Sequence, residues 1–181
     1  MSDLNLDMRV DSARREALLR RSGLAQEAIN RAMRRAVAKT ARWAKAQAAR
    51  AIRADEGIAY RAIRRRLRDF AHSPERMALK VWLGLWRMAA YSLGRADETD
   101  TGVSVGRRRY PGAFLATLES GHKGVFSRMG SRRLPIAEVM ENWGTTGESA
   151  MRQAAAGAEA RLLTLAEQEL RFELLKVTGN V

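Results

Sequence analysis

Residues 107–136 read RRRYPGAFLATLESGHKGVFSRMGSRRLPI and carry the clearest local pattern in the chain. Three arginines and a Tyr-Pro-Gly break lead into an apolar run over residues 113–118. A turn at residues 120–121 separates this run from a second, apolar and basic run over residues 123–129. Two such runs around a glycine turn predict a pair of strands with arginines at both ends.

Length and composition favour one domain with a strong positive charge. The chain has 181 residues, with 33 lysines and arginines against 20 acids, and its formal net charge is +13. A chain of this length has room for one core. The charge favours an acidic partner, which is a nucleic acid, an anionic membrane or an acidic protein face, and arginine suits both phosphate and carboxylate pairing.

The absence of cysteine excludes disulfides, thiolate zinc sites and cysteine nucleophiles. The opening sequence, MSDLNLDMRV, lacks the basic and apolar segments of a signal peptide. The most apolar window, residues 81–93, contains Arg87 and is too short to span a bilayer. We therefore expect a soluble protein that is cytosolic when it is synthesised and has no membrane partner.

The amino-terminal third is expected to be helical and basic. A short helix capped by Asp11 or Ser12 should end at Gly23. Residues 24–54 have apolar positions three or four residues apart, which predicts a long helix with an alanine-rich face that fits a flat partner surface.

A second basic helix is predicted over residues 58–70. Asp55 and Glu56 precede it and are placed to cap its N-terminus. Arginines cover most of the remaining surface of this helix and of the long helix before it. Two interpretations of that surface stay open, which are a solvated basic face and a face that contacts phosphates.

From residue 76 onward the pattern changes toward strands. Residues 77–83 and 85–91 are rich in large side chains and flank Gly84, which predicts one or two strands with a bend at the glycine. A buried helix is the alternative for these short apolar runs. Residues 95–100 are expected to form an acidic loop, and residues 101–105 a short strand.

A long final helix is predicted over residues 146–176. Thr145 and Glu148 have the spacing of a capping box at its start. Its wide apolar face would pack on a sheet and also touch a neighbour, whereas its acids, including Glu169 and Glu173, are interpreted as solvated.

The expected fold class is α+β, because helices, then strands, then a helix follow one another without β-α-β alternation. The strands should form a small, mainly antiparallel sheet of about four strands. We expect a single domain over residues 1–181, made of a flexible tail (1–10), a basic helical region (11–72), a sheet region (76–143) and a C-terminal helix (145–177).

The sequence offers no catalytic, cofactor or metal site, and we do not expect an enzyme. His72 and His122 are the two histidines, and they show no metal-ligand spacing. No serine lies in a nucleophile-elbow context, and no glycine loop carries a P-loop lysine. His122 is interpreted as a turn residue that makes a hydrogen bond. Without a known DNA-reading motif, any nucleic-acid contact should be nonspecific and sensitive to salt.

The central stretch resembles the prophage minor tail protein Z family of long-tailed bacterial viruses. The resemblance lies in RYPGAF at 109–114, in GH at 121–122 with VFSR at 125–128, and in Gly130 with RLPI at 133–136. These elements follow the order and spacing of the family. Weaker similarity extends upstream, to AINRA at 28–32, GI at 57–58 and IRRRL at 63–67.

The resemblance implies a structural virion protein that completes the tail at its head-proximal end, in the neck region, and is needed for head–tail joining. Such a protein would form a ring of identical subunits around the DNA channel, and the usual symmetry of tails suggests a hexamer. Its partners would be the tail terminator, tape-measure and neck proteins, with nonspecific contact to packaged DNA. It would reside in the virion tail, and in the host cytoplasm during assembly, and it needs no cofactor.

Within this interpretation, Phe114, Leu118 and Phe126 of the strand pair should feed the core. The arginines at its ends should project toward a neighbouring subunit or the DNA channel. A nonspecific nucleic-acid-binding protein that acts through its arginine-rich helices is the alternative. The candidate interface or channel residues are Arg107, Arg108, Arg109, Arg128, Arg132, Arg133, Arg64, Arg65 and Arg66.

Overall fold

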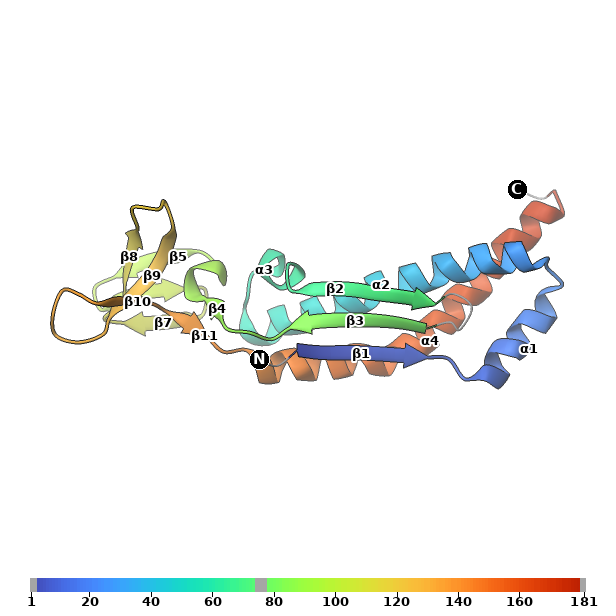
Figure 1. Ribbon diagram of the computed structural model, residues 1–181, viewed down its shortest axis with the longest axis horizontal. Coiled ribbons are helices and arrows are strands. Elements are labelled where there is room, and N and C mark those ends of the chain that lie inside the picture. Colours follow the sequence, from blue (N-terminus) through green and yellow to red (C-terminus); the bar gives the residue numbers. More distant parts are fainter. Residues whose placement is uncertain (1–2, 74–77, 180–181) are drawn as a thin grey trace.

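The computed structural model describes residues 3–73 and 78–179, which form an elongated α+β molecule (Figure 1). Two long helices and a three-stranded sheet make up one part, here called the helical body (residues 3–73, 78–84 and 144–177). Short strands make up the other end, here called the β end (residues 85–143). The mixed α+β class predicted from the sequence is confirmed.

The first two helices begin and end where local sequence signals place them. Helix α1 (Ser12–Ser22) is capped by the Asp11 carboxylate, which accepts hydrogen bonds from two backbone N–H groups of the first turn. Helix α2 (Gln26–Glu56) spans 31 residues and ends at Gly57. Gly57 has a φ of 66°, a left-handed conformation that glycine adopts without a steric penalty, so the predicted break is confirmed.

Helix α4 (Gly144–Val177) runs antiparallel to α2 and is its main packing partner. Alanines such as Ala36 of α2 and Ala158 of α4 are fully buried, so the two backbones approach closely. The predicted long final helix is confirmed, but its predicted capping box is wrong. Trp143 occupies the N-cap position without a side-chain cap, and Glu148 pairs with Arg152 instead.

A three-stranded antiparallel sheet covers one face of the two long helices (Figure 1). Its order is β1 (Asp3–Arg9), β3 (Ala78–Gly84) and β2 (Leu67–Ser73). Val81 and Leu83 on β3 are fully buried, which is the period-two pattern of a strand with one face on a core. The predicted strand with a bend at Gly84 is confirmed up to that glycine; its first residue, Met77, lies outside the described residues.

Two predictions for the amino-terminal region are wrong. The expected flexible tail is strand β1, which pairs with β3 along its whole length; residues 1–2 lie outside the described part. The expected helix over residues 58–70 is helical only in α3 (Tyr60–Arg64) and continues as β2. The reason is long-range pairing, because β3 offers hydrogen-bonding edges on both sides, and a helical local pattern yields to such a partner.

The β end consists of short antiparallel strands. One sheet has the order β5 (Ala96–Thr99), β6 (Gly102–Val105) and β7 (Arg108–Pro111). A second has the order β10 (Ile136–Glu138), β9 (Lys123–Arg128) and β8 (Phe114–Thr117), and β4 (Met88–Ala89) pairs with β11 (Met140–Glu141). A 3₁₀ turn, η1 (Ala90–Ser92), follows β4.

The strand pair predicted over residues 113–129 is confirmed as β8 and β9, and the predicted short strand as β6. The expected single sheet of about four strands is not found, because the described residues form eleven strands in four small sheets. Residues 95–100 are mostly strand β5 and not a loop. Phe126 is buried and Phe114 half-buried, but Leu118 is 38% exposed at the hairpin turn and does not join the core.

Five charged side chains join α2 to α4 and are here called the ion-pair seam: Arg31, Arg35 and Lys39 on α2, and Glu169 and Glu173 on α4. Their spacing of four residues places each set on one face of its helix. Nη2 of Arg31 lies 3.0 Å from Glu173, Arg35 bridges both carboxylates, and Lys39 binds Glu169. Glu169 and Glu173 are only 5% and 2% exposed, so their interpretation as solvated acids is wrong.

The seam keeps both carboxyl groups ionised. Burial alone would raise the pKa of Glu169, but hydrogen bonds from Lys39 and Arg35 outweigh it and lower that pKa. The hydrogen bond from Arg35 lowers the pKa of Glu173, with a further contribution from Arg31 against the opposing effect of burial.

A depressed carboxyl pKa in the folded state stabilises the protein above the ordinary carboxyl pKa. This contribution is lost as the pH falls below about 4.5 and through the lower folded values. We predict that a Glu169→Gln/Glu173→Gln variant loses less stability on acidification than the wild type, as measured by denaturant unfolding across that range.

At neutral pH, Glu173→Gln should lower the free energy of unfolding by about 1–3 kcal/mol, because two guanidinium groups lose a charged acceptor but keep contact with water. Glu167→Gln, on the exposed face of the same helix, is the matched control and should change little. Equal stability of the two variants would show that the seam does not hold the helices together.

Candidate functional site

The nine candidate arginines lie in three places. Arg107, Arg108 and Arg109 lie at the start of β7, where the β end meets the helical body. Arg128, Arg132 and Arg133 lie at or in the loop of residues 129–135, here called the tip loop. Arg64, Arg65 and Arg66 lie at α3 and the turn after it, here called the α3 surface together with Arg61.

Arg108 is held inside the fold. Its guanidinium group donates to the backbone carbonyl of Glu56 at 2.6 Å and also binds the Glu56 carboxylate. The other carboxylate oxygen of Glu56 accepts a hydrogen bond from the Thr146 hydroxyl, and Glu141 lies 3.9 Å from Nε of Arg108. Glu56 therefore connects α2, β7 and α4, and it does not cap the next helix as predicted.

Of the two arginines beside Arg108, one contacts the rest of the fold and the other is exposed. Arg107 donates to the carbonyl of Ala54 at 3.2 Å, and its stem packs against Gly57, so it also serves the fold. Arg109 is exposed on β7. Burial raises the pKa of the nearby Tyr110 hydroxyl, and the Glu141 carboxylate adds to this rise.

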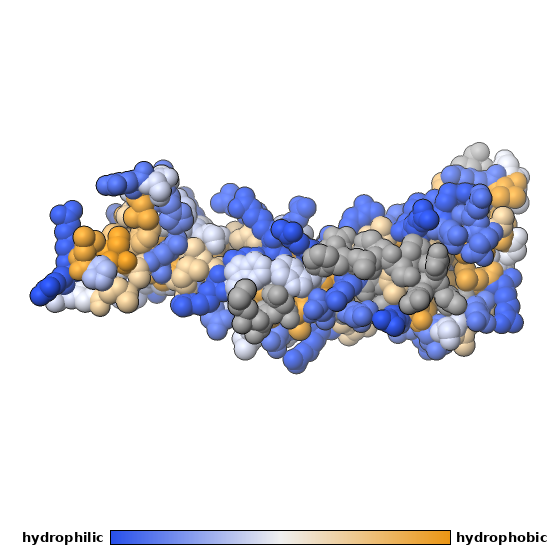
Figure 2. All heavy atoms as spheres, in the orientation of Figure 1, coloured by the Kyte–Doolittle hydropathy of each residue, from blue (hydrophilic) through white to orange (hydrophobic). Residues whose placement is uncertain are grey.

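The tip loop exposes apolar and basic side chains together. Met129 and Leu134 are 67% and 66% exposed, and the N–H of Met129 donates to the carbonyl of Pro135 at 3.0 Å, which closes the loop. Arg132 and Arg133 are exposed between them. Figure 2 shows hydrophobic atoms beside strongly hydrophilic ones at this end of the molecule.

Two aromatic contacts support the second β-end sheet. The Arg128 guanidinium lies 5.6 Å from the centre of the Phe114 ring, so its stem covers this sheet while its charge stays at the surface. The His122 ring lies edge-on to Phe126 and its Nε2 is 2.9 Å from Glu138, which confirms the predicted hydrogen bond of this turn residue.

The α3 surface is exposed at Arg64 and Arg65 and structured at Arg66. The Arg66 guanidinium stacks 4.3 Å from the centre of the Trp86 ring and donates to the carbonyls of Trp86 and Arg87 at 3.2 and 3.4 Å. Burial lowers the pKa of Arg66. These contacts fix the direction of Arg66, whereas Arg64 and Arg65 project from the short helix.

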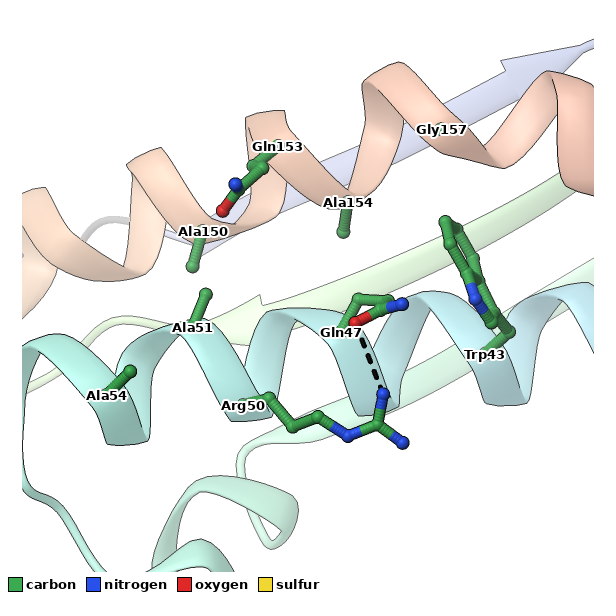
Figure 3. A pocket seen from close by; sticks show the side chains of 9 residues that line it. All are labelled: Trp43, Gln47, Arg50, Ala51, Ala54, Ala150, Gln153, Ala154 and Gly157. Atoms are coloured by element: carbon green, nitrogen blue, oxygen red, sulfur yellow. Dashed lines mark hydrogen bonds between the residues drawn. The ribbon is translucent and has the colours of Figure 1, made fainter.

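A groove of about 520 Å³ runs between α2 and α4 on the face away from the sheet (Figure 3). Four alanines, two from each helix, form much of its wall, and Trp43 lies against Gly157. Arg50 is its charged residue and donates to Gln47 at 3.2 Å within the same helix. The groove thus lacks the paired titratable groups that acid–base chemistry requires.

Among residues 3–73 and 78–179, no group of three or more metal-ligating side chains could hold a metal ion. In the same residues, no helix is long and apolar enough to cross a membrane. No protein-family model, no curated protein and no solved structure matches the chain.

Sequence reasoning found the arginines but not their partners. The ion pair of Arg108 with Glu56 joins residues 52 positions apart, and the hydrogen bond from Thr146 to Glu56 joins residues 90 apart. No local pattern indicates contacts over such separations. Arg61 is not among the nine candidate arginines, although its spacing of four from Arg65 places both on one face of a helix.

We predict that Arg108→Ser lowers the free energy of unfolding by about 2–3 kcal/mol, because it leaves partly buried carboxylates without their cation. Arg109→Ser, the exposed neighbour on the same strand, is the control and should be nearly neutral. Denaturant unfolding measures both. If the two variants were equally stable, Arg108 would be available for an interface.

Proposed function

We propose that this chain is a structural protein of a long-tailed bacterial virus, a minor tail or tail-completion component at the head-proximal end of the tail. In this role it forms a ring around the DNA channel and is needed for head–tail joining. The observation that carries the proposal is the tip loop. It contains most of the final element of the family resemblance, and it exposes two large apolar side chains on either side of a pair of arginines.

An exposed combination of this kind suits a protein contact. Covering apolar side chains as exposed as Met129 and Leu134 with a partner protein removes them from water, which lowers the free energy of the complex. Arginines beside them supply planar, bidentate hydrogen bonding to carboxylates on that partner. The tip loop lies at one extreme of an elongated molecule, where a neighbour can reach it without displacing the core (Figure 1).

The opposite extreme also exposes apolar side chains, which supports a ring of identical subunits. Phe172, Leu174 and Val177 near the end of α4 are 40%, 43% and 73% exposed. Different apolar surfaces at the two ends of one chain favour head-to-tail contacts, and such contacts close into a ring when the rotation between subunits permits. The remaining partners in this proposal are the tail terminator, tape-measure and neck proteins.

Nonspecific binding of nucleic acid is the second candidate function, and the α3 surface favours it. The ion-pair seam neutralises three of the cations on α2, so these are not free for phosphate as the sequence interpretation allowed. Arg64 and Arg65 are exposed and have no ion-pair partner in the described part of the chain.

We predict that Arg132→Ser/Arg133→Ser and Met129→Ser/Leu134→Ser variants remain folded, because all four side chains are exposed, but fail to join tails to filled heads. Circular dichroism measures folding, and electron microscopy of the particles with infectious titre measures joining. Arg20→Ser/Arg152→Ser removes the same charge from exposed helical sites as a control. Normal particles assembled without this protein would refute the role.

A further inference from the structure

The α3 surface differs from the seam face of α2 in that its exposed arginines have no carboxylate partners among the described residues. Arg61, Arg64 and Arg65 make no ion pair among the residues that the structure describes, whereas Arg31 and Arg35 on α2 are neutralised by buried glutamates. Three guanidinium groups within five consecutive positions repel one another. A bound anion would relieve this repulsion.

Two hollows lie beside α3, and neither contains a carboxylate among its described lining residues. The larger, of about 420 Å³, is lined by Arg61, Arg65 and Arg66 together with Tyr91 and Ser92. Its lining thus combines three guanidinium groups with the Tyr91 hydroxyl, all of which can donate hydrogen bonds to an oxyanion, whereas the Ser92 hydroxyl donates to the carbonyl of Ala89.

The smaller hollow, of about 300 Å³, repeats this chemistry on the adjacent face of α3. Arg64 and Tyr60, four residues apart on the helix, line it with Arg42 and Lys45 of α2. The two hollows share the short helix between them. An extended polyanion could therefore occupy both, whereas a single small anion could fill only one.

Arg66 holds the larger hollow in shape. Its guanidinium plane is fixed by the Trp86 ring and by two backbone carbonyls, so its direction does not depend on the ligand. The Trp86 ring also contacts the Trp82 ring, with 5.3 Å between centres. Because Trp86 is occupied in this way, it does not offer a stacking platform for an unpaired base.

We propose that the two hollows beside α3 bind phosphates of a nucleic-acid backbone. Guanidinium groups and hydroxyls gathered in these hollows suit phosphodiester oxygens, and contacts to phosphates carry no sequence information, so binding is independent of sequence. Duplex and single strand both present these phosphate oxygens, so both forms bind. The α3 surface thereby contacts DNA, whereas the tip loop contacts protein. The inference does not rest on the tail-completion role, because its test uses the isolated protein.

The test measures binding of a fluorescent, mixed-sequence DNA, as duplex and as single strand, to the full chain. The variant is Arg61→Ser/Arg65→Ser. We expect its affinity for both DNA forms to fall at least about tenfold at 50 mM salt. We also expect the slope of log affinity against log salt to decrease by about 1.8 on duplex, roughly 0.9 for each lost phosphate contact.

Two further variants separate a site from a general charge effect. Arg132→Ser/Arg133→Ser removes the same charge from the tip loop and should bind DNA as the wild type does. Arg61→Lys/Arg65→Lys keeps the charge and should retain most of the affinity. Circular dichroism checks that the serine variant at α3 folds. If it did not, Arg64→Ser, which alters the smaller hollow, would be measured instead. We expect this single variant to change the salt slope by about half as much, roughly 0.9.

Unchanged DNA binding by the folded serine variant at α3 would overturn the proposal. Equal losses in the α3 and tip-loop variants would also overturn it, because only net charge would then matter. A tip-loop variant that binds DNA normally but fails in head–tail joining would support both roles. If tails joined heads normally without the protein, the tail role would fail while the binding data still decided this inference.

Discussion

The packing of α2 against α4 is the constraint on which the rest of the structure depends. Alanine-rich faces let the two helices approach closely, and the buried carboxylates of Glu169 and Glu173 then require cations at matching positions on α2. Moving α2 along α4 by one turn would leave a buried carboxylate with an incomplete set of partners, at a cost of about 3–5 kcal/mol. The seam therefore fixes the register of α2 against α4, and these two helices support the sheet β1–β3–β2.

The partly buried carboxylate of Glu56 helps to attach the β end to the helical body. Glu56 ends α2, and its contacts with Arg108 and Thr146 gather β7 and the start of α4 at one point. Hydrogen bonds from Arg107 to the Ala54 carbonyl and from Arg66 to the Trp86 carbonyl add to this junction. Together these contacts hold the β end on the helical body, with the tip loop at the far extreme of the molecule (Figure 1). Arginines of the stretch 107–136 thus serve the fold at its start, at Arg107 and Arg108, and lie at the surface near its end, at Arg132 and Arg133.

The basic side chains lie in three kinds of environment, which the sequence alone does not distinguish. Some cations neutralise buried acids, as Arg35 does in the seam. Others lie beside exposed apolar residues in the tip loop, a combination that suits contact with a protein partner. In the described part of the chain, Arg61, Arg64 and Arg65 on α3 have no ion-pair partner, and they line hollows together with tyrosine side chains, which is an arrangement suited to phosphate. Net charge alone indicates an acidic partner, and the pairing of each cation decides which partner it can be.

The sequence by itself determined the features that depend on neighbouring residues. Asp11 starts α1, and Gly23 and Gly57 end α1 and α2, because capping and left-handed turns depend on local sequence. The hairpin of β8 and β9 likewise follows from its glycine turn. Only the tertiary structure decided that Asp3–Arg9 and Leu67–Ser73 are strands, because both depend on hydrogen bonds to the distant β3. It also decided that Glu169 and Glu173 are buried. An acid on a helix is predicted to be solvated unless its cations are known, and here those cations come from more than a hundred residues earlier in the chain.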